Sequence, residues 1–250
     1  MDIPVGTSVA SAPDSCWSQS ETRYCCHTPT YLTESGKPAA LYKLFGQAFK
    51  QATGTAMRQQ AIVDGMTEPV IFRKTAELHG ISTDRATFED FARCSSHLHR
   101  LHAHELRERG HALPGAAAAL AALAEMEGVV QSVVTGNIRP VAEIKLQVFG
   151  LDTHIQFPYG GYGEDHDDRA ELVRTAITRT RHAITTPFTE ADVLLIGDTP
   201  ADVVAGRTAG VRVLGVATGR TTTTELNTAG ATTTITSLED LQPLRALLHR

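Results

Sequence analysis

Two aspartates that follow a short apolar run are the residues of this chain with the clearest chemical use. Residues 193–196 predict a strand buried on both faces, and Asp198 follows after a glycine that permits a sharp turn. Residues 201–209 predict a helix that Gly210 ends, so Asp202 lies one turn beyond Asp198 and can face the same site. Ligands of open parallel sheets bind at the carboxyl ends of strands. Each aspartate alone also fits a helix cap or a solvated charge, but the pair favours a site.

A second strand with a polar end lies earlier in the chain. Residues 129–134 are mostly valine and lead into Thr135, Gly136 and Asn137. A threonine hydroxyl, together with the free backbone N–H groups of a following helix start, is a donor set that holds a phosphate oxygen. Lys145 lies on the predicted helix after this turn and can return a positive charge to the same site, although a single lysine on a helix is usually solvated.

In order and spacing, these residues resemble the haloacid dehalogenase superfamily of phosphohydrolases. Thr135 stands where the second motif of the family has Ser or Thr, and Lys145 stands where the third has Lys. Asp198 and Asp202 match the acidic pair of the fourth, GDxxxD. Further stretches that look like phosphoglycolate-phosphatase-like members are residues 113–123, 160–173 and 217–226. The resemblance implies phosphate binding by Thr135, Gly136, Asn137 and Lys145, a catalytic part for Lys145, and Mg²⁺ binding by Asp198 and Asp202.

The resemblance also implies an α/β fold, with a Rossmann-like parallel sheet flanked by helices and an α-helical cap inserted between the first and second motifs. We expect residues 1–38 to form a diverged N-terminal segment that includes the first core strand, 39–112 the helical cap, and 113–250 the core. Helical spacing within the cap is shown by Leu41, Leu44, Phe45, Ala48 and Phe49, and then by Ile71, Thr75 and Leu78.

The first motif of the family, an apolar run followed by DxDGT, has no match in this chain. In the family it supplies the nucleophilic aspartate, a second aspartate as general acid and base, and two Mg²⁺ contacts. Aligning residues 30–36 with the stretch that follows the nucleophile puts Cys26 and Thr28 at the positions of the two aspartates. The strand leading in, residues 22–25, is poorly apolar. Cys26 is either a replacement nucleophile with a lowered thiol pKa or a buried, inert thiol, and loss of the motif weakens the Mg²⁺ prediction.

The first 29 residues admit two interpretations. They hold three of the four cysteines and the only tryptophan, with no helical or strand period. They are either a genuine diverged segment that replaces the catalytic strand or the product of a mis-set start or shifted reading frame.

Several polar residues outside the motifs are candidates for substrate contacts. Asp64, Thr67 and Glu68 are the cap residues expected nearest the phosphate, although a helix cap with a first-turn acid explains them equally well. Asp165 lies in an acidic loop near the site, and Arg169 follows it as a residue that caps or binds there. A helix start rich in acids also accounts for this loop.

Four histidines lie close together in the predicted cap, at positions 97, 99, 102 and 104. Only His99 and His102 have the spacing that a shared metal needs. We therefore expect a solvated helix face.

Composition limits the class of protein. The chain has 250 residues, 42% hydrophobic and 20% charged, which suits one α/β unit with an inserted cap. A net charge of −5 argues against nucleic acid or an anionic membrane as partner. No stretch is apolar enough to span a bilayer, and the start lacks a signal-peptide pattern. The cysteines show no zinc spacing, so a reducing cytoplasm is expected.

Two functions remain open at this point. The first is a phosphomonoesterase that acts on a small phosphorylated metabolite with an altered nucleophile site. The second is a catalytically silent relative that binds a phosphorylated ligand or a partner protein through the remaining motifs. The oligomeric state cannot be read from the sequence.

Overall fold

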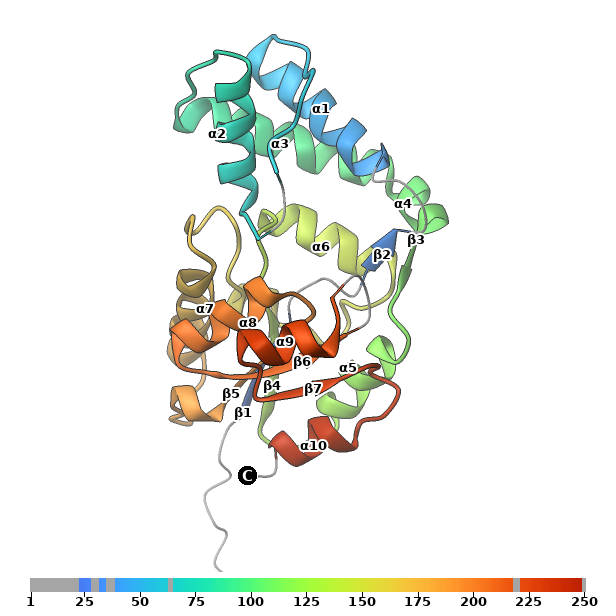
Figure 1. Cartoon of the computed structure of the whole chain (residues 1–250), viewed down its shortest axis with the longest axis vertical. Helices are drawn as coiled ribbons and strands as arrows, with labels where there is room; N and C mark the ends of the chain where they lie inside the picture. The colour runs from blue at the N-terminus through green and yellow to red at the C-terminus, as the bar shows by residue number, and fades with distance from the viewer. Residues whose placement is uncertain (1–22, 28–31, 35–38, 63–64, 218–220, 249–250) are drawn as a thin grey trace, which may run out of the picture.

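A five-stranded parallel sheet forms the centre of the computed structural model, which describes residues 23–27, 32–34, 39–62, 65–217 and 221–248 (Figure 1). The strand order is β4-β1-β5-β6-β7. Their bounds are β4 Val129–Val133, β1 Arg23–His27, β5 Val193–Gly197, β6 Arg212–Val216 and β7 Thr233–Ile235. The expected parallel sheet of an α/β fold is confirmed.

Alternating side chains of β5 divide the core into two faces. Leu194 and Ile196 belong to one apolar cluster, and Val193 and Leu195 belong to the other, as the period of two in a strand requires. The first face is covered by α5 (Ala116–Ala124), α6 (Arg139–Val148) and α10 (Gln242–Leu248). The second is covered by α7 (Arg169–Ala183), α8 (Pro200–Ala209) and α9 (Thr223–Ala229). Every residue of β5 is buried, which confirms the strand expected from its apolar run.

Strand β1 lies between β4 and β5 and pairs with both. Its sequence, RYCCH, lacks the apolar run of its neighbours. A strand is nevertheless present at Arg23–His27, within the N-terminal segment that was expected to include the first core strand. Because hydrogen bonds to two neighbouring strands satisfy the backbone on both sides, β1 does not depend on a strong sequence pattern.

Four helices form an insert between β1 and β4, and we call residues 39–109 the helical insert. They are α1 (Ala39–Thr53), α2 (Glu68–Leu78), α3 (Arg85–Leu101) and α4 (Ala103–Arg109). In Figure 1, α1 to α3 lie above the sheet, with α6 beneath them. They share an apolar cluster of their own, which includes Phe45, Phe49, Phe72 and Phe91. The helical pattern is confirmed except at Leu78, which ends α2 and is 53% exposed.

Two short strands lie on either side of the helical insert in the sequence. β2 (Leu32–Glu34) pairs antiparallel with β3 (Gly110–Ala112), so the chain enters and leaves the insert side by side. The remaining helical turns are η1 (Phe157–Tyr159) and η2 (Glu190–Asp192). The domain boundaries expected after residues 38 and 112 stay a prediction. Within the described ranges, the helices are all too short or too polar to cross a bilayer.

Candidate active site

Thr135 and Asp198 follow the ends of two strands that flank β1. Thr135 comes after β4, where its N–H donates to the carbonyl oxygen of Gly161 at 2.9 Å, and its side chain is buried. Asp198 comes directly after β5. Since both strands run parallel to β1, both residues lie at the carboxyl edge of the sheet. This is the edge at which the sequence predicts a site.

A chain of hydrogen bonds links Thr135 to Lys145 through Asn137. The backbone and side-chain amides of Asn137 both donate to Thr135 Oγ1, at 3.1 and 2.9 Å. Lys145 Nζ donates to Asn137 Oδ1 at 2.8 Å. Because Asn137 fills the acceptor positions of the Thr135 oxygen, the hydroxyl hydrogen can be donated to a ligand. The structure therefore brings three of the predicted phosphate-binding residues into one group.

Two carboxylates occupy the start of α6. The Ile138 N–H donates to Glu68 Oε2 at 2.9 Å, and the Arg139 N–H donates to the two oxygens of Glu164 at 2.9 and 3.1 Å. Burial raises the pKa of both carboxyls. The expectation of free N–H groups at this helix start is wrong, because carboxylates complement the positive end of the helix dipole. The N–H groups of Ile138 and Arg139 are therefore occupied, while phosphate binding by Thr135, Gly136, Asn137 and Lys145 stays a prediction.

Gly136 lies directly against the helical insert. Its carbonyl oxygen accepts the Glu68 N–H at 2.7 Å. A Cβ at this position would lie 2.7 Å from the Met66 carbonyl oxygen, 3.2 Å from Thr67 Cα and 3.3 Å from Arg169 Nη1. Only glycine permits this approach without a shift of the backbone. Thr67, an expected substrate contact, is therefore packed against Gly136 and is fully buried.

The carboxylate of Asp202 is held by two neighbours. Its Oδ2 accepts bonds from the Thr199 side chain at 2.7 Å and from the Thr199 N–H at 3.2 Å, as part of a capping box at the start of α8. Its Oδ1 forms an ion pair with Arg169, which the sequence had suggested as a substrate contact. A metal ion bound by Asp202 would share this carboxylate with Arg169 and Thr199.

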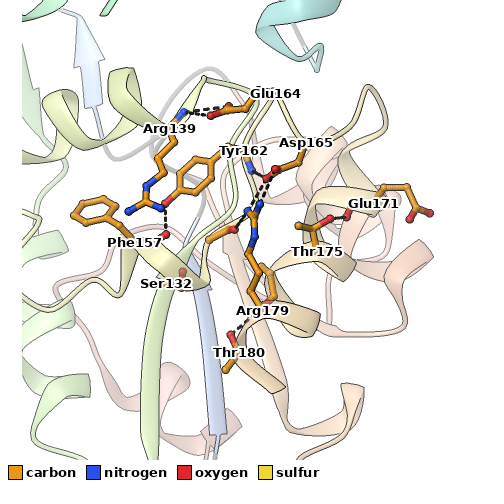
Figure 2. A network of polar contacts seen from close by, with 12 residues as sticks. Ser132, Arg139, Phe157, Tyr162, Glu164, Asp165, Glu171, Thr175, Arg179 and Thr180 are labelled. Atoms are coloured by element: carbon orange, nitrogen blue, oxygen red, sulfur yellow. Dashed lines mark hydrogen bonds and ion pairs between the residues drawn. The ribbon is translucent and has the colours of Figure 1, made fainter. Parts of the chain in front are cut away.

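Asp165 faces Arg179, as Figure 2 shows. The two guanidinium nitrogens of Arg179 donate to the two oxygens of Asp165, each at 2.7 Å, and the Tyr162 N–H donates to the same carboxylate at 2.9 Å. Bidentate pairs of this kind fix geometry. Asp165 thus braces the loop that precedes α7. Arg179 was not found from the sequence, because nothing distinguishes it from the other arginines of α7.

The comparisons with known proteins agree with this geometry. The model of the haloacid dehalogenase-like hydrolase family matches residues 38–216. The chain belongs to this family. No curated protein matches the chain.

Solved structures of the haloacid dehalogenase-like fold resemble the chain over nearly its whole length. A hydrolase from Pseudomonas syringae has a TM-score of 0.59 at 20% identity, covering 90% of this chain and 98% of that one. A haloacid dehalogenase-like hydrolase from Bacteroides fragilis has a TM-score of 0.57 at 22% identity, covering 88% and 100%. A protein from Bacteroides vulgatus described as a beta-phosphoglucomutase has a TM-score of 0.57 at 14% identity, covering 92% and 89%. These likenesses show the haloacid dehalogenase-like fold.

The register of β1 bears on the missing first motif of this haloacid dehalogenase-like chain. Cys26 pairs with Ser132 of β4 and Leu195 of β5. Thr135 and Asp198 each come three positions later, so Cys26 lies roughly 10 Å short of their level at about 3.3 Å per residue. Thr28 lies outside the described residues. The catalytic roles of Cys26 and Thr28 stay predictions.

The Mg²⁺ that such hydrolases generally use was predicted to bind Asp198 and Asp202, and this stays a prediction. In the part of the chain that the structure describes, no three His, Cys, Asp or Glu side chains converge on one point. Mg²⁺ often takes only one or two carboxylates and completes its coordination with water and substrate phosphate. Asp198 fits that role by its place directly after β5 at the carboxyl edge of the sheet, and Asp202 lies one turn further along, bonded to Arg169 and Thr199. When bound, the ion would neutralise phosphate charge.

His99 is buried in the helical insert, which corrects the expectation of a solvated histidine face. Its ring contacts the Ser95 carbonyl oxygen, with 2.8 Å between Nδ1 and O. Of the four, His97 and His104 are exposed, and His102 is half-buried. Burial, helped by the positive charge of Lys145, lowers the pKa of His99 to about 4. The burial of His99 was not predicted, because His97 and His99 both lie on α3 and only the position of the helix against its neighbours decides which of them is buried.

His99→Gln is expected to flatten the dependence of stability on acidity. The unfolded residue titrates near pH 6.5 and the folded one at about 4, so the unfolded chain binds more protons between these values. Stability from this group is therefore present above pH 6.5 and lost as pH falls to 4, by up to about 3 kcal/mol. Urea unfolding at several pH values measures it, with the exposed His97→Gln as control. Equal acid sensitivity in native protein and His99→Gln would contradict the assignment.

Proposed function

We propose that the chain is a phosphomonoesterase that acts on a small phosphorylated metabolite. The observation that carries this proposal is the bonded group of Thr135, Asn137 and Lys145 at the sheet edge, across β1 from Asp198. A hydroxyl and an ammonium joined through one asparagine suit a phosphate group. Family membership agrees with hydrolysis of this kind.

Each residue has a defined part in this proposal. The Thr135 hydroxyl donates to a phosphate oxygen, and Lys145 offsets the phosphate charge while Asn137 fixes its ammonium. Asp198 would hold Mg²⁺. Asp202 retains Arg169 at the edge of the site, and the helical insert serves as a cap that selects the substrate. Cys26 and Thr28 take the positions of the two family aspartates.

A second candidate is a silent relative that binds a phosphorylated ligand or a partner protein without hydrolysis. The register of Cys26, which stops short of Thr135 and Asp198, favours it. A thiol is also a poor Mg²⁺ ligand compared with a carboxylate. The two candidate functions share the phosphate-binding residues and differ only in whether the bound substrate is hydrolysed.

Thr135→Val tests the proposal directly. We expect Mg²⁺-dependent phosphate release from an aryl phosphate and a panel of sugar phosphates to fall about 100-fold, because a positioned donor to the phosphate is lost. Thr180→Val is the matched control, since Thr180 is equally buried but donates to a carbonyl inside α7. Equal losses in both variants would contradict the phosphate role of Thr135.

The same assay on native protein and Cys26→Ala separates the two candidates. Release that disappears in Cys26→Ala would assign the nucleophile to the thiol. Release that persists would place it elsewhere. Phosphate binding without any release, in either protein, would favour the silent relative.

A further inference from the structure

Glu68 joins the helical insert to the loop that carries Asn137. We call residues 135 to 138 the 135–138 loop. The Glu68 N–H donates to the Gly136 carbonyl oxygen at 2.7 Å, and Glu68 Oε2 accepts the Ile138 N–H at 2.9 Å. One residue of the insert therefore bonds to the loop on each side of Asn137. Asn137 is the residue that links Thr135 to Lys145.

The Glu68 carboxylate is fixed from the insert as well. Its second oxygen accepts a bond from Ser95 Oγ of α3 at 3.3 Å, and the side chain is 8% exposed. A buried carboxylate is costly unless its oxygens are bonded and opposite charge is near. Here the Ile138 amide, the start of α6 and the charge of Lys145 offset that cost.

A second contact between insert and core provides a comparison. Arg73 of α2 forms an ion pair with Asp167 at 2.7 Å, with both side chains about half exposed. Exposed pairs contribute little, and this one does not touch the 135–138 loop. Loss of it would remove one contact between insert and core without altering the bonds of Glu68.

We propose that Glu68 is a positioning residue: it holds Gly136 and Ile138 so that Asn137 presents the Thr135 hydroxyl and the Lys145 ammonium to a phosphate group. Through this residue, the phosphate affinity of the loop depends on one specific contact from the helical insert. The inference rests on the proposed phosphate site, but it adds a residue outside that site and a connection between insert and loop.

Two conservative substitutions of Glu68 separate the effect of side-chain length from the effect of side-chain charge. Glu68→Asp keeps the charge and shortens the side chain, so Ile138 loses its acceptor. Glu68→Gln keeps the length and a carbonyl oxygen that still accepts from Ile138, and it removes a negative charge near the phosphate. Both are compared with native protein and Arg73→Gln by amide hydrogen exchange of the loop and by the dissociation constant for inorganic phosphate.

For Glu68→Asp we expect faster exchange at Ile138 and about tenfold weaker phosphate binding, the loss typical of a bond to a charged group. Glu68→Gln should exchange as the native protein does and bind phosphate at least as tightly. Arg73→Gln should match native protein in both measurements.

The proposal is overturned if Glu68→Asp leaves Ile138 exchange and phosphate affinity unchanged, or if Glu68→Gln loses as much affinity as Glu68→Asp. It is also overturned if Arg73→Gln weakens phosphate binding equally, since docking alone would then explain the effect. Native protein that binds no phosphate would refute the phosphate site itself and with it the coupling. Exchange at Ile138 in that case still shows separately whether Glu68 fixes the loop.

Discussion

Asp198→Asn should reduce Mg²⁺-dependent phosphate release by about 1,000-fold, to the rate seen without the ion. Asp198 follows β5 at the sheet edge, across β1 from Thr135, and it is the carboxylate that we propose holds the metal ion. An asparagine has nearly the same shape but carries no charge, so it is a far weaker Mg²⁺ ligand. A loss of this size corresponds to about 4 kcal/mol of transition-state stabilisation.

The measurement for Asp198→Asn is the initial rate of phosphate release as a function of Mg²⁺ concentration. Asp240→Asn is a suitable control, since Asp240 is exposed and accepts only a local bond from the Gln242 N–H. Unchanged turnover and Mg²⁺ dependence in Asp198→Asn would rule out this carboxylate as the metal ligand.

Lys145→Met is the second substitution with a large expected effect. We expect kcat/KM for phosphate release to fall by about 100- to 1,000-fold. Methionine keeps most of the side-chain length but removes the ammonium that donates to Asn137. Phosphate would then face the buried carboxyl of Glu68 without an opposing charge. Charge-assisted contacts to phosphate carry losses of this order.

A second property should change in Lys145→Met. The charge of Lys145 helps to lower the pKa of His99, so that pKa should rise from about 4 toward the ordinary value when the charge is removed. The ring signals of His99 in an NMR titration report it. Lys50→Met, at an exposed position of α1, serves as the control. Native kinetics and an unchanged His99 titration in Lys145→Met would contradict the placement of this charge.

Local sequence was sufficient to predict the elements that carry the motifs. The apolar run before Asp198 gave a strand because it is buried on both faces, and Gly210 ends α8 in the left-handed conformation that favours glycine. The approach of Lys145 to Asn137 followed from a helix that begins just after a strand end. In each case the determining pattern lies within about twenty residues.

The features that sequence reasoning missed depend on contacts between distant segments. Glu68 reaches Ile138 across 70 positions of the chain, and Glu164 reaches Arg139 across 25. Neither bond has a local signal, although both carboxylates were visible as acids near predicted helix starts. β1 was weakly marked for the same reason, since its place depends on the two strands that pair with it.

Calorimetric titration of inorganic phosphate into native protein and Lys145→Met tests the central claim most directly. We predict one bound phosphate per native chain and affinity at least 100-fold weaker in the variant, because the Thr135, Asn137 and Lys145 group would lose its positive charge. This binding is expected whether or not the chain hydrolyses a substrate. No binding by the native protein, or equal affinity in the two proteins, would contradict it.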